Sequence, residues 1–168
     1  RDGLRVLALA YRERVLEKTE KGLTGNLIFA GMAGMIDPPR KETAQSVKTL
    51  KQAGVQVAMI TGDYKDTAFA IARKTGIAQS MDQCITGQEL NEMTEEEFAA
   101  KMKNIRVFAR VTPAHKVKIV QRFRRGGEIV AMTGDGVNDA PSLQAADIGI
   151  AMGKSGTDVA KNAADMIL

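Results

Sequence analysis

The sequence predicts an α/β fold with a doubly wound, mainly parallel sheet, preceded by a short β segment. Three observations predict it. Apolar segments of strand length alternate with amphipathic segments of helix length, polar residues follow the apolar segments, and glycine or proline stands at most boundaries. Strands that alternate with helices form parallel sheets. With 168 residues, 44% of them hydrophobic, the chain has the length and composition for a folded core.

The first two predicted strands occupy residues 4–11 and 27–36, and the polar segment 12–25 connects them. Both strands are nearly continuous apolar runs, which is typical of strands buried on both faces. We therefore expect both strands to be buried.

Two adjacent prolines, Pro38 and Pro39, follow the second strand. They exclude a helix at Asp37, because proline disfavours the helical conformation in the residue before it. We therefore place a domain boundary here, with residues 1–36 on one side and residues 37–168 on the other.

From residue 40 onward, the pattern predicts alternating helices and strands. Gly54 and Gly76 predict the ends of the first two helices, since glycine favours the position after the last helical turn. Within the polar segment 82–104, Thr94 and Glu97 have the spacing of a capping box and predict a further helix start. The other predicted ranges are helices over about 40–53, 65–75, 113–125 and 137–145, and strands over 55–60, 106–110, 128–132 and 148–152.

Polar residues follow three of these strands. Carboxyl ends of parallel strands share one edge of a sheet, and ligands bind there in open α/β folds. A phosphoryl-transfer site needs a hydroxyl, a lysine and carboxylates that hold Mg²⁺. Thr61, Lys116 and Asp135 supply these groups in turn. The full set is Thr61, Gly62 and Asp63 after the first strand, Arg110 and Lys116 after the second, and Asp135, Asn138 and Asp139 after the third.

Each of these residues also has a structural interpretation. Asp135 and Asp139 could cap a helix, but one helix start does not need two acids, so we favour function. Lys116 alone is compatible with an exposed helix position, and Thr61 with a strand-end turn. We expect His115, the only histidine, to face solvent rather than bind a metal, because no second His or Cys ligand is near.

The composition argues against several classes of protein. No apolar run approaches the roughly 20 residues of a membrane helix, and no signal peptide is predicted. Cys84 is the only cysteine, so we expect it to pack as a small apolar residue in a reducing compartment. The net charge is +4 and aromatic residues make up 4%, which argues against a nucleic-acid partner.

The order of these motifs resembles the haloacid-dehalogenase superfamily, and their longer forms resemble the cytoplasmic part of P-type cation-transporting ATPases. The match covers nearly the whole chain and is most similar to calcium pumps of bacterial type. The motifs that carry it are Asp37-Pro38-Pro39-Arg40, Met59-Ile60-Thr61-Gly62-Asp63, Phe108-Ala109-Arg110-Val111, Pro113-Ala114-His115-Lys116, Thr133 through Pro141, and Ala145 through Gly153.

The resemblance implies a haloacid-dehalogenase-like fold and a cycle in which ATP phosphorylates an aspartate, whose phosphate then drives ion movement through membrane helices. It implies Mg²⁺ and ATP as cofactors and a location on the cytoplasmic face of a membrane, with the chain itself soluble. The implied roles are Asp135 as Mg²⁺ ligand with Asn138 and Asp139 beside it, Lys116 on the phosphoryl group, Thr61 and Gly62 as its cradle, Asp63 and Arg110 towards the nucleotide, and Asp37 and Arg40 at the hinge.

One motif of the family is missing from this chain, the nucleophile segment Asp-Lys-Thr-Gly-Thr. In the family it lies upstream, beyond the nucleotide-binding domain, whose last strands residues 1–34 resemble. Arg1 in place of a methionine and the abrupt end at Leu168 also favour a piece of a longer protein. We therefore expect the downstream part of a phosphorylation domain, inactive alone, with the upstream segment and membrane helices of the parent chain as partners.

In the superfamily the nucleophile strand is central, between the strands that end at Thr61 and Thr133. Its absence would expose two parallel edges, which tend to pair with other strands. We expect the gap to be filled by a neighbouring molecule, through self-association at the exposed edge, or by the segment 27–36. Two alternatives remain for the function: a soluble phosphatase, which would need its own nucleophile, and an inactive Mg²⁺- or nucleotide-binding module.

Overall fold

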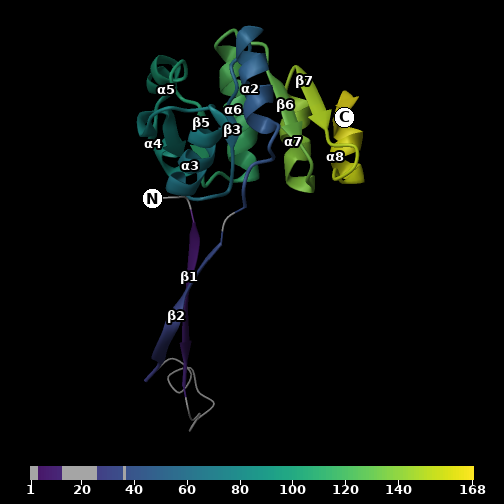
Figure 1. Ribbon diagram of the computed structural model, residues 1–168. Helices are drawn as coiled ribbons and strands as arrows, with labels where there is room; N and C mark the ends of the chain where they lie inside the picture. Colours follow the sequence, from purple (N-terminus) through teal and green to yellow (C-terminus); the bar gives the residue numbers. More distant parts are fainter. Residues whose placement is uncertain (1–3, 13–25, 36) are drawn as a thin grey trace.

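The computed structural model describes residues 4–12, 26–35 and 37–168, and it consists of a long β hairpin attached to an α/β body (Figure 1). In the hairpin, β1 (Arg5–Tyr11) pairs antiparallel with β2 (Ile28–Met35). Both strands were predicted, while most of the predicted connector between them lies outside the described residues.

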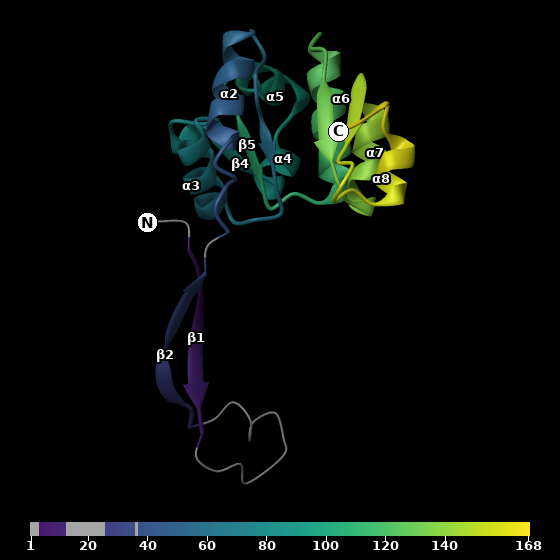
Figure 2. The ribbon, with the colours of Figure 1, turned by 45° about the vertical axis from the view of Figure 1, so that its right-hand side comes forward.

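The hairpin extends away from the body in both ribbon views (Figures 1 and 2). Its large apolar side chains are exposed on both faces. Val6 and Leu9 are each 53% exposed, and these two residues lie on opposite faces of β1. The sequence pattern predicts buried strands. In the structure, β1 and β2 chiefly contact each other among the described residues, and their large apolar side chains are exposed.

The elements of the body follow one another as alternating helices and strands. They are α2 (Thr43–Gln52), β3 (Met59–Ile60), α3 (Lys65–Thr75), the 3-10 turn η1 (Met81–Gln83), β4 (Cys84–Thr86), α4 (Gly87–Glu92), α5 (Glu95–Lys101), β5 (Val107–Ala109), α6 (Pro113–Arg125), β6 (Ala131–Gly134), the 3-10 turn η2 (Val137–Asp139), α7 (Ala140–Ala145), β7 (Ile148–Ala151), α8 (Asp158–Ala163) and β8 (Met166–Ile167).

The strands of the body form two separate parallel sheets. One has the order β3-β5-β4 and the other the order β6-β7-β8. Figure 2 shows the two halves of the body side by side, each with its own helices. The predicted fold class, an incomplete, mainly parallel α/β fold, is confirmed.

Helix boundaries agree closely with the sequence pattern because local signals set them. Gly76 follows α3 in the left-handed conformation, with φ 77°, which closes the helix. Thr112 caps the start of α6 and Pro113 occupies its first turn. Thr94 and Glu97 form the predicted capping box at the start of α5.

Strand boundaries agree less well. The strand predicted over 55–60 contains only Met59–Ile60, because β5 is its single partner and begins at Val107. The strand predicted over 128–132 is shifted to Ala131–Gly134, where it pairs with β7. The short strands β4 and β8 and the helices α4 and α8 were not predicted, because segments this short carry little periodicity.

Three apolar clusters form the core, and α6 contributes to two of them. Ile119 packs with the β3-β5-β4 half, and Val120, the next residue, packs with the β6-β7-β8 half. Cys84 is 2% exposed in a third cluster, which confirms its predicted packing role. The helix α6 therefore links the two halves of the body.

Candidate functional site

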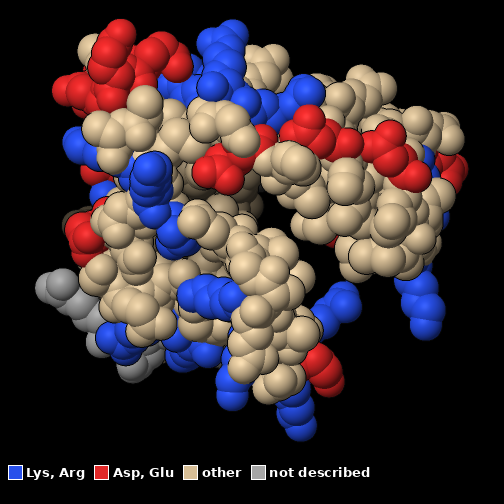
Figure 3. Space-filling model, turned by 90° about the horizontal axis from the view of Figure 1, so that it is seen from above, with Lys and Arg blue, Asp and Glu red and all other residues tan. Residues whose placement is uncertain are grey.

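A groove of about 1000 Å³ separates the two halves of the body. No ladder joins β3 and β6 among the residues that the structure describes, so the structure contains the gap that the missing strand predicts. Side chains on its edges are exposed, with Ile129 at 84%. Figure 3 shows an opening between the two lobes, with charged side chains around its rim.

The expectation that residues 27–36 fill this gap is wrong. The described part of that segment, Ile28–Met35, pairs along its length with β1, outside the body. All seven of its cross-strand partners lie on β1, so β2 belongs to the hairpin and is not inserted between β3 and β6. Filling by a neighbouring molecule stays a prediction.

The turn after β3 places Thr61, Gly62 and Asp63 at the carboxyl end of the first sheet. The Thr61 hydroxyl donates to Asp63 Oδ2 at 2.9 Å and accepts from the Asp63 amide at 3.1 Å. A Cβ added to Gly62 would meet no atom within 4 Å, so packing does not require a glycine there. The turn therefore keeps open space above its backbone.

The same turn is tied to the segment that leads into α6. The Arg110 amide donates to the Asp63 carbonyl at 3.0 Å, and the Val111 amide donates to the Thr61 carbonyl at 3.2 Å. Arg110 has φ 53°, a conformation uncommon for a residue with a side chain. Its guanidinium lies 4.5 Å from the ring centroid of Tyr64. The first two predicted strand ends thus meet at one edge.

Lys116 and Asp139 form the central ion pair of the site. Lys116 Nζ lies 2.5 Å from Asp139 Oδ1, and both side chains are largely buried. Asp139 Oδ2 accepts from the Gly136 amide at 3.1 Å and from the Asp135 amide at 3.3 Å. A Cβ on Gly134 would lie 2.5 Å from Asp139 Cβ, so only glycine permits this placement.

The electrostatics of Asp139 favour its charged form. Burial acts to raise the pKa of the Asp139 carboxyl, but the hydrogen bond from Lys116, the Gly136 amide and the charge of Lys116 together outweigh it. The pKa of Asp139 therefore lies below its ordinary value. The charged carboxylate is stabilised by Lys116 and by two backbone amides, which shows why its ionised form is favoured.

Asp135 and Asn138 differ from Asp139, because their side chains are exposed. The Asp135 carbonyl accepts from the Thr157 amide at 2.9 Å, while no protein hydrogen bond to its carboxylate is found within the described ranges. Asp135 lines the groove together with Lys116 and Asp139. Its free oxygens suit Mg²⁺, which prefers carboxylates and keeps several waters.

These residues supply only part of the coordination that Mg²⁺ needs. Within residues 4–12, 26–35 and 37–168, no group of three His, Cys, Asp or Glu side chains is placed to hold a metal ion. Asp139 is held by Lys116 and two amides, which leaves Asp135 as the available carboxylate. The donor chemistry fits Mg²⁺, but a phosphate oxygen or a further carboxylate would have to complete its coordination.

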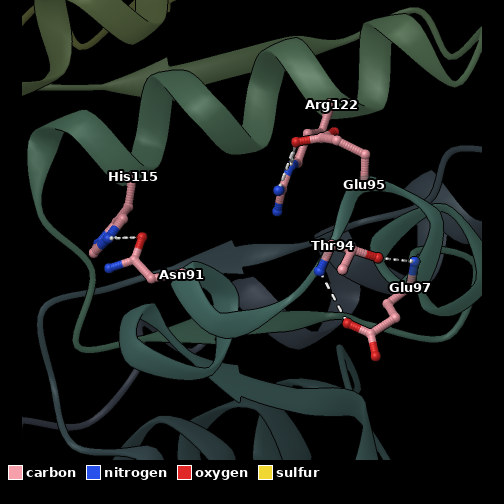
Figure 4. A network of polar contacts seen from close by, with 6 residues as sticks. All are labelled: Asn91, Thr94, Glu95, Glu97, His115 and Arg122. Atoms are coloured by element: carbon pink, nitrogen blue, oxygen red, sulfur yellow. Dashed lines mark hydrogen bonds and ion pairs between the residues drawn. The ribbon is translucent and has the colours of Figure 1, made fainter.

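His115 is not placed as predicted. It is half-buried rather than facing solvent, and its Nε2 lies 3.0 Å from Asn91 Oδ1, a residue of α4 (Figure 4). Its Nδ1 accepts from the Thr112 amide at 3.1 Å. The spacing of Thr112 and His115 matches a capping box and could have indicated the second contact, whereas no local signal points to Asn91.

Comparison with known proteins places these observations in a family. A model of the haloacid dehalogenase-like hydrolases matches residues 4–147, and the chain belongs to this family of hydrolases. None of the helices in the described part of the chain is both long and apolar enough to cross a membrane.

The curated relatives of the chain include calcium-transporting ATPases. The chain is 53% identical over 169 residues to calcium-transporting ATPase 1 of Bacillus cereus. This match includes the whole of the chain and 19% of that protein. It is 47% identical over 166 residues to human calcium-transporting ATPase type 2C member 1, covering 99% of the chain and 17% of the relative. The resemblance to P-type calcium pumps is confirmed, and the chain spans about a fifth of the length of these relatives.

Proposed function

We propose that this chain is part of an ATP-driven cation pump of the calcium type, on the cytoplasmic face of a membrane, and that it supplies the groups that surround the phosphoryl group. The observation that carries this proposal is the largely buried Lys116–Asp139 pair beside the open carboxylate of Asp135 at one end of the groove. A cation and a free carboxylate at the carboxyl edge of parallel strands suit a Mg²⁺-phosphate ligand.

Each residue of the site has a role that its surroundings support. Lys116 offsets the charge of the phosphoryl group from a position that Asp139 fixes. The open backbone at Gly62 offers a donor to phosphate oxygens, and the Thr61 hydroxyl would offer another by exchanging its Asp63 acceptor for phosphate. Asp63 and Arg110 lie at the exposed rim, where Arg110 stacks on Tyr64, and they would meet the nucleotide. For Mg²⁺, we propose Asp135 as the ligand, with Asn138 and Asp139 beside it.

Bound Mg²⁺ would neutralise negative charge on the phosphate and orient it. The protein groups act around it: Asp139 holds the Lys116 ammonium in place, and the amides of Asp135 and Gly136 hold Asp139. Because these donors and acceptors are already in place before the phosphate arrives, little reorganisation is needed at the moment of transfer.

The domain division follows the same proposal. Residues 1–36 would be the end of a nucleotide-binding domain and residues 37–168 the greater part of a phosphorylation domain, with Asp37 and Arg40 at the hinge. The separation of the hairpin from the body supports a boundary there (Figure 1). The groove would receive the nucleophile strand from the upstream part of the parent chain.

A decisive experiment uses the full-length pump that contains this chain. Lys116→Ala should lower Mg²⁺-dependent ATP hydrolysis by at least about a hundredfold, the effect of removing one group that stabilises transition-state charge. Arg124→Ala is the matched control, because it likewise removes the cation of an ion pair between α6 and the second half, the pair with Asp147, away from the phosphate. Equal activity in the two variants would contradict the proposal.

The isolated chain separates this proposal from a free-standing phosphatase. Without a nucleophile, it should show no ATPase or phosphatase turnover above background. Turnover that survives purification and disappears in Asp135→Ala would favour the phosphatase instead. Calorimetric Mg²⁺ titration of the isolated chain and of its Asp135→Ala variant tests the remaining alternative, an inactive binding module. Such a module would bind Mg²⁺ tightly even without the upstream strand.

A further inference from the structure

The position of Lys116 depends on how α6 is held. This helix contributes Ile119 to the core of the β3-β5-β4 half and Val120 to the core of the β6-β7-β8 half. Lys116, in its first turn, reaches across to Asp139 in the second half. Any contact that fixes the first turn of α6 against the first half therefore also fixes where the Lys116 ammonium lies.

His115 makes that contact. Its Nδ1 accepts from the Thr112 amide at 3.1 Å, so Nε2 carries the ring proton and donates to Asn91 Oδ1 at 3.0 Å (Figure 4). One imidazole thus completes the cap of α6 and binds the helix to α4. The neutral ring makes both bonds with a single tautomer.

The first turn of α4 is shaped to receive this ring. A Cβ on Gly87 would lie 2.7 Å from His115 Nδ1 and 2.8 Å from the Arg110 carbonyl oxygen. Only glycine permits so close an approach of α4, the ring and the strand-end loop. Thr86 and Glu89 cap the same turn, and Glu89 binds Lys65 of α3 at 2.8 Å, so the receiving surface is itself held.

A second contact lies further along the same face of α6. Arg122 is seven residues after His115, about two helical turns on. Its Nη2 and Nε lie 2.7 and 3.0 Å from Glu95 Oε1 (Figure 4). Its guanidinium lies 4.7 Å from the ring centroid of Phe98. The helix is therefore held against α4 and α5 at both its beginning and its later turns.

We propose that His115 and Asn91 form a positioning pair that holds the first turn of α6 so that the Lys116 ammonium reaches the site. The inference rests on the proposed role of Lys116. His115 itself touches no reacting group. It acts through the backbone of α6, whose next side chain points about 100° further round the helix, towards Asp139.

The test separates the Asn91 contact from the helix cap. Asn91→Ala removes the acceptor, and His115→Gln can still complete a capping box with Thr112 while giving up the imidazole donor. Asn91→Asp keeps a side-chain oxygen and should rescue. Asn104→Ala is the control, because it removes another side-chain hydrogen bond, to Asp82 at 2.9 Å, that does not involve α6.

The first readout is the NMR signal of the Lys116 ammonium in the isolated chain. Its exchange with water is slowed while Asp139 holds it. Asn91→Ala and His115→Gln should raise the exchange rate by at least about twofold, as expected for coupling through connected side chains. Asn91→Asp and Asn104→Ala should leave it at the wild-type value. Loss of thermal stability with an unchanged Lys116 signal would overturn the proposal.

The second readout, in the full-length pump, is kcat with KM for ATP. Asn91→Ala and His115→Gln should lower kcat with little change in KM, because they displace a group that acts in the transition state. If Lys116→Ala keeps its activity while the ammonium signal still responds to Asn91→Ala, the proposed function fails and the positioning pair stands. If Lys116→Ala is inactive and Asn91→Ala has wild-type kcat, the positioning pair is overturned.

Discussion

The two ends of α6 are each tied to the second half of the body by an ion pair, and the two pairs differ in their surroundings. At the first turn, Lys116 and Asp139 have side chains 19% and 10% exposed. At the last turn, Arg124 and Asp147 are 46% and 30% exposed. Both carboxylates also accept backbone amides. The two links are therefore alike in their partners and differ mainly in burial. We expect the more buried pair to serve the proposed site and the more exposed pair to serve packing.

The largest expected difference between the two ends is in activity. In the full-length pump, Asp139→Ala should lower ATP hydrolysis by about a hundredfold or more, because Lys116 loses its anchor and the phosphate loses a fixed cation. Asp147→Ala should retain most of the activity. Steady-state hydrolysis of both variants checks this, and similar losses at the two ends would remove the distinction.

The second difference is in stability. Lys116→Met leaves the buried Asp139 carboxylate without its cation and should lower the free energy of unfolding by about 2 kcal/mol. Arg124→Met, at the exposed pair, should cost less than about 1 kcal/mol. Urea denaturation of the isolated chain measures both values, and equal losses in the two variants would show that solvent exposure does not weaken the second pair.

Two glycines near the site, Gly134 and Gly62, are expected to differ in how substitution affects stability and activity. Gly134→Ala should destabilise the chain by about 1–3 kcal/mol, because its Cβ would overlap Asp139. Gly62→Ala should leave stability within about 0.5 kcal/mol, since no atom lies within 4 Å of the new Cβ. In the pump, however, Gly62→Ala should lower activity, because the added methyl group occupies the space proposed for phosphate. Denaturation and hydrolysis together distinguish packing from binding.

The smallest expected effect is on pH dependence. The pKa of Asp139 is lowered in the folded chain from an ordinary value of 3.8. Its contribution to stability is therefore fully present above about pH 4 and is lost as the pH falls through the folded pKa. Asp139→Asn should show a shallower fall in stability over this acid range, measured by thermal unfolding at stepped pH. In Asp147→Asn, the fall in stability with decreasing pH that comes from Asp139 should be retained.

Local signals made much of the fold predictable. Capping residues such as Thr94 and Thr112 bind amides three residues away, so their spacing is visible in the sequence. The order of the strand-end motifs also anticipated that Lys116 and the Asp135–Asp139 loop would meet. Strand lengths were less predictable, because a ladder depends on the partner strand. The apolar pattern predicts a strand over 55–60, but β3 starts only at Met59, opposite Val107, where its parallel partner β5 begins.

The fold class, the family, most of the long-helix starts and the missing nucleophile segment could all be predicted from the residues alone. Three contacts could not: Asp139 rather than Asp135 holds Lys116, β2 pairs with β1 and leaves the groove open, and His115 meets Asn91. Helix caps and turns arise between neighbours in the chain, whereas these contacts join residues far apart in it. The contacts of Lys116 and His115 depend, in addition, on how α6 packs between the two halves.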